Sequence, residues 1–361
     1  MVKMNITCPD CGQSFQYDER DRGHKIKCAH CRQVIPVPPI SLSREIFWKR
    51  LVGIRKILLV ACVLILVAAT VVVGMGIVVP VSIRWADRRP IGALFLASHS
   101  AASPTNPRGW FNDPGLDVTG TNGPQRFRQA LLEYTDRSLA ILKRTEAQGV
   151  IVWDLEGEQF PQKTSYIGDP RLLDRLAPEM ASVADEFFGR LRSAGLRIGL
   201  TVRPQQLVFD DDGLPRQTQV INLKRSLLDK IDYARARWGA TIFYIDSNGG
   251  IRRPDEVWQL RRLAEQRPDI LLIPEHHYQF YRVFSAPYVS LRKGDSTATA
   301  IKARKLFPGS FQVLDIGDVP NDRIITARLQ GDILLFRAWF WSPECQLLEG
   351  FANGGPEDNP R

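Results

Sequence analysis

The sequence predicts an α/β protein whose large domain is a (β/α)8 (TIM) barrel, preceded by a small four-cysteine module and one transmembrane helix. Three patterns support this: paired cysteines near the N-terminus, an uncharged apolar stretch at 57–83, and short apolar runs that alternate with amphipathic ones across 84–350. A chain of 361 residues is long enough for two or three folded units. The remaining parts are a basic linker at 39–56 and a tail at 351–361 whose composition predicts disorder.

The composition excludes several classes of protein. Hydrophobic residues make up 44% of the chain and charged residues 24%, as in globular rather than disordered proteins. Six cysteines are too few for a disulfide-stapled scaffold. The net charge of +9 raises the question of nucleic acid. The positive residues form no stripe interleaved with aromatics, so no nucleic-acid partner is expected.

Four cysteines in the segment 1–38 form two Cys-x-x-Cys turns. They are Cys8, Cys11, Cys28 and Cys31. Each turn directs two thiolates at one ion, and two turns complete a tetrahedron, so the spacing predicts a structural zinc site. A module this short buries too little core to fold alone, and the metal would supply its folding free energy. Two disulfides or a redox pair are the alternatives, but neither accounts for two matched turns.

The same segment resembles a known class of small domain. The motifs TCPDCG at 7–12 and KCAHC at 27–31, followed by VIPVP at 34–38, look like the short zinc ribbons at the N-termini of many bacterial membrane proteins. The resemblance implies a binding or regulatory module rather than a catalyst. The candidate partner of this module is a cytosolic protein. Thiolates stay reduced in the cytosol, which agrees with that location.

The stretch 57–83 contains no charged side chain and is predicted to be a single transmembrane helix. About 20 apolar helical residues cross a bilayer core, and a buried core helix of this length is the weaker alternative. Trp48 and Trp85 flank the stretch, as membrane-interface aromatics do. Basic residues crowd its N-terminal side more than its C-terminal side. The bias predicts a cytoplasmic N-terminus and an extracytoplasmic large domain, anchored in the bacterial inner membrane.

Eight apolar runs in the large domain predict strands. They lie at 91–99, 149–154, 196–202, 240–245, 270–274, 287–291, 311–315 and 332–338. Most lack polar alternation, as in strands that are buried on both faces. Amphipathic stretches at 125–147, 170–193, 223–238 and 254–265 predict helices between them. The rhythm matches a (β/α)8 barrel. A doubly wound open sheet is the alternative, because 278–286 is short for a crossover helix.

Polar and aromatic residues follow most of these predicted strands, where a barrel places its functional groups. We expect catalytic carboxyl groups at Asp246, Asp295, Glu275 and Glu156, and substrate contacts from Arg203, Asp154, Trp110, Tyr244, Asn248 and His276. Asp315 and Asp318 follow the seventh run. Paired carboxyl groups, hydroxyl-binding polar groups and flat aromatic faces are what a carbohydrate site needs. A lone Asp after a strand is more often a helix cap, but the next helix begins beyond capping reach of Asp246.

Two short motifs resemble the retaining α-glucosidase and α-galactosidase clan of (β/α)8 glycosidases. FYIDSN at 243–248 is similar to the clan's nucleophile motif after strand four, and KGDS at 293–296 is loosely similar to its acid/base motif after strand six. The resemblance implies Asp246 as nucleophile and Asp295 as acid/base. The tryptophan expected near the second motif is replaced by LRK at 291–293, so Glu275 and Glu156 are alternatives for the acid/base role.

The functional hypothesis is a membrane-anchored glycoside hydrolase-like protein that cleaves or binds a carbohydrate. A non-catalytic glycan-binding or sensor protein is one alternative, since a ribbon, a single span and an outer domain also suit a sensor. A metal-dependent hydrolase is another, with His99, Glu275, His276 and His277 as ligands. Adjacent histidines on a strand point in opposite directions, which disfavours that reading.

Overall fold

The computed structural model describes residues 3–39, 83–159, 167–213, 215–249, 254–276, 278–290, 304–305, 307–339 and 342–354. They fall into two compact units, Met1–Val78 and Val79–Arg361. The predicted transmembrane stretch 57–83 lies outside the described residues apart from its last one, as do the linker beyond residue 39, Asp295, and the tail from 355. Among the described residues, no helix combines the length and the hydropathy that crossing a membrane requires.

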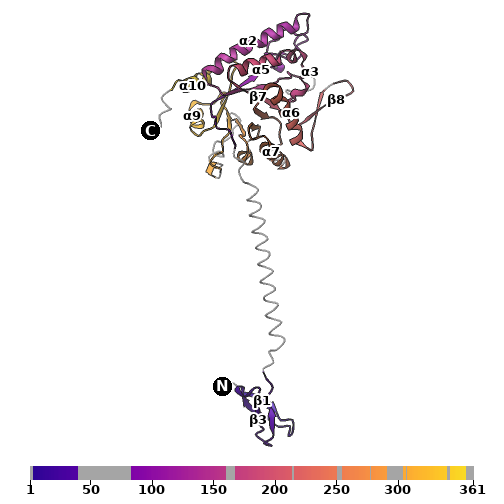
Figure 1. Cartoon of the computed structure of the whole chain (residues 1–361), viewed down its shortest axis with the longest axis vertical. Coiled ribbons are helices and arrows are strands. Elements are labelled where there is room, and N and C mark those ends of the chain that lie inside the picture. The colour runs from indigo at the N-terminus through magenta and orange to yellow at the C-terminus, as the bar shows by residue number, and fades with distance from the viewer. Residues whose placement is uncertain are drawn as a thin grey trace. The chain divides into compact units, whose positions relative to one another are not determined.

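The N-terminal unit consists of two antiparallel hairpins (Figure 1). In the first, β1 (Lys3–Thr7) pairs with β2 (Ser14–Asp18), and in the second β3 (Lys25–Lys27) pairs with β4 (Val34–Pro36). A 3-10 turn, η1 (Glu19–Asp21), follows β2. The two cysteine pairs lie in the two hairpin turns. The small core holds Cys8, Cys28 and Ile35, against which Ile6, Phe15 and Ile26 pack.

The large unit is a near-closed barrel of eight parallel strands. In chain order they are β5 (Ile91–Phe95), β6 (Gly149–Trp153), β7 (Arg197–Val202), β10 (Ile242–Ile245), β11 (Leu271–Pro274), β12 (Tyr288–Ser290), β13 (Val313–Asp315) and β14 (Ile333–Arg337). All eight predicted strands are confirmed. The hydrogen-bonded order follows the chain, and β14 pairs with β5, so the last strand lies beside the first. The open-sheet alternative is therefore wrong.

The seam of the barrel lies between β11 and β12, which no ladder joins within the described strands. A 3-10 helix, η5 (Gln279–Val283), takes the place of a crossover helix there. The N–H of Ala286 donates to the carbonyl of Leu272 at 3.0 Å and ties the two edges together at one point. The short connection in the sequence thus leaves the barrel almost, but not fully, closed.

Helices surround the barrel (Figure 1). They are α2 (Gly123–Arg144), α5 (Ala184–Ser193), α6 (Leu223–Trp238), α7 (Pro254–Gln266), α9 (Asn321–Leu329) and α10 (Pro343–Ala352). The single helix predicted at 170–193 is instead broken into η3 (Pro170–Leu172), α3 (Leu173–Leu176), α4 (Pro178–Ala181) and α5. Pro178 lacks the N–H that would continue α3, so a new turn begins there. A hairpin of β8 (Gln206–Phe209) and β9 (Pro215–Thr218) follows β7, and η2 (His99–Ala101) follows β5.

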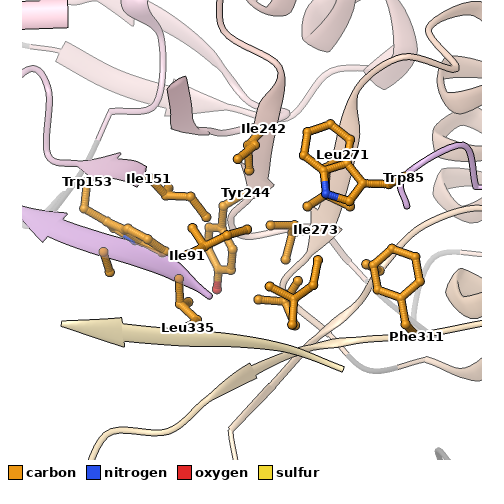
Figure 2. Close-up of a cluster of buried hydrophobic side chains, with 14 residues drawn as sticks. Trp85, Ile91, Ile151, Trp153, Ile242, Tyr244, Leu271, Ile273, Phe311 and Leu335 are labelled. Carbon is orange, nitrogen blue, oxygen red and sulfur yellow. The ribbon is translucent and has the colours of Figure 1, made fainter. Parts of the chain in front are cut away.

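Alternate residues of the strands fill the barrel interior, as Figure 2 shows for Ile91, Ile151, Ile242, Leu271 and Leu335. Trp85 belongs to this core, and its indole N–H donates to the Gln148 side chain at 2.9 Å. The prediction that Trp85 sits at a membrane interface is therefore wrong. Its ring is buried because it packs among the inward-facing residues of the strands.

Candidate functional site

A cavity of about 260 Å³ opens where the strands end. Phe95, Trp153, Ser290, Asp315 and Arg337 are each the last residue of a strand and line it. Asp246 and Glu275, the first residues after β10 and β11, line it as well. The remaining lining residues are Ala93, Tyr244, Tyr288, Leu335 and Phe336. Among the described residues, the lining of this cavity thus includes three carboxyl groups, Asp246, Glu275 and Asp315, and the guanidinium of Arg337.

Aromatic rings form a continuous wall of this cavity. Phe95 stacks on Trp153 with ring centroids 5.3 Å apart, and Trp153 lies 4.8 Å from Tyr244. Tyr244 meets Tyr288 edge-on at 5.4 Å. Figure 2 shows the rings of Trp153 and Tyr244 among the inward-facing residues. The wall therefore offers flat apolar surface next to the carboxyl groups.

Asp246 is held by two donors on the same oxygen. The Nε of Arg203 lies 2.5 Å from its Oδ2, and the Ser247 hydroxyl donates to that oxygen at 3.1 Å. Arg203 also donates to the Gln217 side chain on β9 at 3.1 Å. Because Arg203 and Asp246 are both buried, their ion pair is largely shielded from water. The sequence placed both residues at the site, and the structure joins them directly.

Glu275 is linked to Asp246 through one residue. The backbone N–H of Ser247, whose φ is +56°, donates to Glu275 Oε2 at 2.8 Å. Asn248, buried behind this turn, accepts from the Glu275 N–H at 2.9 Å and donates to the Tyr281 hydroxyl at 2.9 Å. Asn248 thus fastens the turn to β11 and η5 rather than facing the cavity.

Two charged lining residues, Asp315 and Arg337, had not been assigned a role from the sequence. Asp315 accepts from the Tyr288 hydroxyl at 2.8 Å and from the Gly317 N–H at 3.0 Å. Arg337 ends β14 beside them. The signal for Arg337 was present, because a single charge closes the otherwise apolar run ILLFR. Arg337 was not predicted, because the candidate residues were those that follow a predicted strand and Arg337 lies inside the strand predicted at 332–338.

A second group of carboxyl groups, Asp154, Glu156 and Glu158, follows β6 and is not among the residues that line the cavity. Burial raises the pKa of Asp154 well above its ordinary value, with the charges of Glu158 and Glu156 adding to the effect. Burial also raises the pKa of Glu156 and of Glu158 to about 7. Asp154 Oδ1 and Glu158 Oε2 find no hydrogen-bond partner in the described part of the chain.

Two other predicted contact residues lie away from the cavity. Trp110 is wholly buried, packs 5.0 Å from Phe127, and donates its indole N–H to Glu179 at 2.7 Å. It therefore presents no surface to a ligand. His276 is exposed, and His277 lies outside the described residues. Within the part of the chain that the structure describes, only the four cysteines bring ligand atoms close enough for a metal ion.

The four cysteine sulfurs form a compact cluster. Cys8 Sγ lies 3.7 Å from Cys31 Sγ, and Cys11 Sγ lies 3.8 Å from Cys28 Sγ. All four sulfurs lie within 4.8 Å of one another. A tetrahedral ion with thiolates at about 2.3 Å has sulfur–sulfur edges of about 3.8 Å, so the cluster fits such an ion. The backbone N–H groups of Cys31 and His30 lower the pKa of Cys28 to about 7, which favours its thiolate.

The two cysteine turns are near copies of each other, a repeat that the sequence search missed. The N–H of Cys8 donates to Gln13 O at 2.9 Å, and the N–H of Cys28 donates to Gln33 O at 2.8 Å. The fifth position carries a positive φ in both turns, +68° at Gly12 and +60° at Arg32. Aligning CPDCGQ with CAHCRQ would have revealed it.

No protein-family model matches the chain, and no curated protein matches it. Similar solved structures include an α-amylase from Geobacillus thermoleovorans, complexed with acarbose, at 9% identity and a TM-score of 0.44, covering 69% of this chain and 70% of that one. An α-galactosidase from Lactobacillus brevis matches at 12% identity, TM-score 0.41, over 74% of this chain and 40% of that one. A Thermotoga maritima α-fucosidase matches at 11%, TM-score 0.38, over 75% and 73%. The chain is thus similar in its barrel to these glycosidase structures, and at these values the similarity carries no further conclusion about it.

Proposed function

We propose that the large unit is a glycoside hydrolase-like domain that cleaves or binds a carbohydrate at the barrel mouth. The observation that carries the proposal is the coupling of Asp246 and Glu275 through Ser247 at the edge of an aromatic-walled cavity. Most glycosidases use two carboxyl groups flanking the scissile bond. Aromatic faces supply the apolar surface that a sugar ring covers.

The hydrogen bonds suggest different roles for the two carboxyl groups. Asp246 Oδ2 accepts from a guanidinium and a hydroxyl, the pattern of an ionised carboxylate, which only accepts. This suits a nucleophile or a group that orients water. Glu275 accepts one backbone N–H on Oε2, which leaves Oε1 to carry a proton toward the leaving oxygen. Asp295, which lies outside the described residues, and Glu156 stay the other candidates for that proton donor.

The sequence supports three further parts of the proposal. The apolar stretch at 57–83 would anchor the chain in a bacterial inner membrane, with the barrel outside and the N-terminus in the cytoplasm. The cysteine cluster would hold one structural zinc ion. The ribbon would then present a small folded surface to a cytosolic protein partner.

The test uses the full-length purified chain and a panel of aryl glycosides. On any substrate that turns over, Asp246→Asn should lower kcat by about 10³-fold, since removing a reacting carboxyl costs at least as much as a general acid contributes. Asp255→Asn, on the exposed first turn of α7, is the matched control and should act as wild type. Wild-type turnover by Asp246→Asn would refute the role of Asp246.

One observation favours a binding protein as the second candidate. Asp246, Glu275 and Asp315 all accept hydrogen bonds from the protein itself, so each carboxyl group is already occupied in part. Saturable binding of a saccharide, weakened by Tyr244→Ala and accompanied by no turnover on the panel, would establish this candidate over the enzyme.

A further inference from the structure

Lys230 is a wholly buried lysine in the middle of α6. Its Nζ donates to the carbonyl of Arg203 at 2.7 Å and to the carbonyl of Gln205 at 2.6 Å. The Asp169 Oδ2 lies 3.6 Å away. An ammonium group has three N–H donors: two are taken up by hydrogen bonds to the carbonyls, and the charge is balanced by an ion pair with Asp169. Buried lysine is rare without such partners, so this one has a specific task in the fold.

The two carbonyls belong to the segment that positions Arg203. The Arg203 N–H donates to Gly168 O at 3.0 Å, and the Arg203 carbonyl accepts from Lys230. Both backbone polar groups of Arg203 are therefore hydrogen-bonded. Gly168 has a φ of +63°, and a Cβ there would come within 2.6 Å of the Arg203 nitrogen. The backbone of Arg203 is therefore closely fitted, which fixes where its guanidinium can reach.

Gln205 connects Lys230 to the Asp246 carboxyl group through a second chain of hydrogen bonds. Its side-chain N–H donates to Ser247 O at 3.0 Å, and the Ser247 hydroxyl donates to Asp246 Oδ2. Lys230 thus supports both donors of Asp246, one through the Arg203 backbone and one through Gln205 and Ser247. No substrate contact by Lys230 is required, since it is fully enclosed.

We propose that Lys230 is a positioning residue that holds Arg203 and Ser247 in register on Asp246. The inference rests on the proposed function only for the chemical role of the Asp246 carboxylate, and the positioning of Arg203 and Ser247 is independent of it. The competing explanation is a purely structural ion pair between Lys230 and Asp169. The distances argue against it, because Asp169 pairs more closely with Arg171, at 2.8 Å, and Lys230 lies nearer to the two carbonyls than to Asp169.

The test measures the Arg203 guanidinium directly in the full-length chain. Selective 15N-arginine labelling gives one Nε–H signal per arginine, and the signal lost in Arg203→Lys identifies Arg203. A buried Nε–H bonded to a carboxylate exchanges slowly with solvent. In Lys230→Met, which keeps the volume but removes the donors, we expect the exchange rate to rise at least about tenfold. Lys224→Met, on the same helix but partly exposed, should leave it unchanged.

A second variant separates the two explanations even if Lys230→Met fails to fold. Asp169→Asn keeps both carbonyl bonds of Lys230 and weakens the ion pairs of Asp169 with Lys230 and with Arg171, so Arg203 exchange should stay within about twofold of wild type. Exchange that rises as strongly in Asp169→Asn as is expected for Lys230→Met would overturn the proposal, as would an unchanged rate in a folded Lys230→Met.

Turnover gives an independent readout. If a glycoside substrate is found, Lys230→Met should lower kcat by about 10²-fold with a smaller change in KM, since small displacements of reacting groups cost about that much. If no glycoside is turned over, the hydrolytic form of the proposed function fails, while the exchange result still decides the role of Lys230.

Discussion

Arg203 and Asp246 form an ion pair at 2.5 Å although 43 positions separate them in the sequence. Their strands β7 and β10 are parallel neighbours, and Ile245 lies in register with Val202. Arg203 is the first residue after β7 and Asp246 is the first residue after β10, so both lie at the same edge of the sheet. Their side chains are only 10% and 9% exposed, so the pair is much less screened than a surface ion pair.

Breaking this pair from one side should be costly. Arg203→Met leaves the Asp246 carboxylate buried without its cation, and we expect the free energy of unfolding to fall by about 3–5 kcal/mol. Arg203→Met combined with Asp246→Asn should recover much of that loss, since no charge then stays unpaired. Urea denaturation of the four variants of the cycle measures both values.

An exposed ion pair provides the control for that cycle. Arg126 bonds Asp117 at 3.0 Å with its side chain 54% exposed, so Arg126→Met should cost no more than about 1 kcal/mol. Equal losses at the two sites would show that burial does not strengthen the Arg203 pair.

The N-terminal unit should depend on metal, and the barrel should not. We expect one zinc ion per chain, and Cys28→Ser to abolish stoichiometric zinc because three thiolates and a hydroxyl bind it weakly. Removing the metal with a chelator should unfold the hairpins, since their core consists largely of the ligands themselves. Metal analysis and NMR before and after chelation test this. Ribbon signals that stay dispersed without metal would contradict it.

Glu156 should make stability depend on pH. Burial raises its pKa to about 7, so folding favours the protonated form. That stabilisation is complete below the unfolded pKa of about 4.3 and is lost as pH rises through about 7. Glu156→Gln cannot ionise. Compared with this variant, the wild type should lose up to about 3 kcal/mol of unfolding free energy between pH 4.5 and 8.

The matched control for this pH effect is Glu133→Gln on the exposed side of α2. Its difference from wild type should stay constant over the same pH range in urea titrations. A Glu156→Gln difference that is equally flat would mean that Glu156 ionises in the folded protein as it does in water.

Substitutions at the fifth positions of the two cysteine turns should have opposite effects on zinc affinity. Gly12 and Arg32 both have positive φ, a conformation that costs a residue with a Cβ about 1–2 kcal/mol. Gly12→Ala should therefore weaken zinc affinity by about tenfold, and Arg32→Gly should strengthen it by a smaller factor. Gln13→Ala, whose backbone rather than side chain bonds Cys8, is the control. Competition with a chromophoric chelator gives the affinities, and weaker binding by Arg32→Gly would refute the strain argument.

Much of the barrel could be predicted because its signals are local. The eight strands are short apolar runs, and the rule that functional groups follow strands singled out Asp246 and Glu275, which line the cavity, and Arg203, which bonds Asp246. The helix 170–193 was predicted whole because its apolar spacing continues across Pro178, which in fact divides it.

These sequence patterns could not predict whether a given side chain would line the cavity or pack elsewhere in the fold. Trp110 and Glu156 follow strands as Asp246 does, yet neither lines the cavity. A loop residue turns inward or outward according to what packs against it, and for Trp110 that is Phe127 and Glu179, the latter 69 positions away. Asp315 and Arg337 line the cavity as the last residues of β13 and β14.

The amino-acid sequence alone determined the two cysteine turns, the eight strands and the acidic residues after β10 and β11, because each depends on neighbours in the chain. Only the tertiary structure decided that Arg203 meets Asp246, that Ser247 couples it to Glu275, and that Lys230 supports both. Those contacts join different strands and helices, and they form only when the sheet closes and excludes water from the polar groups between them.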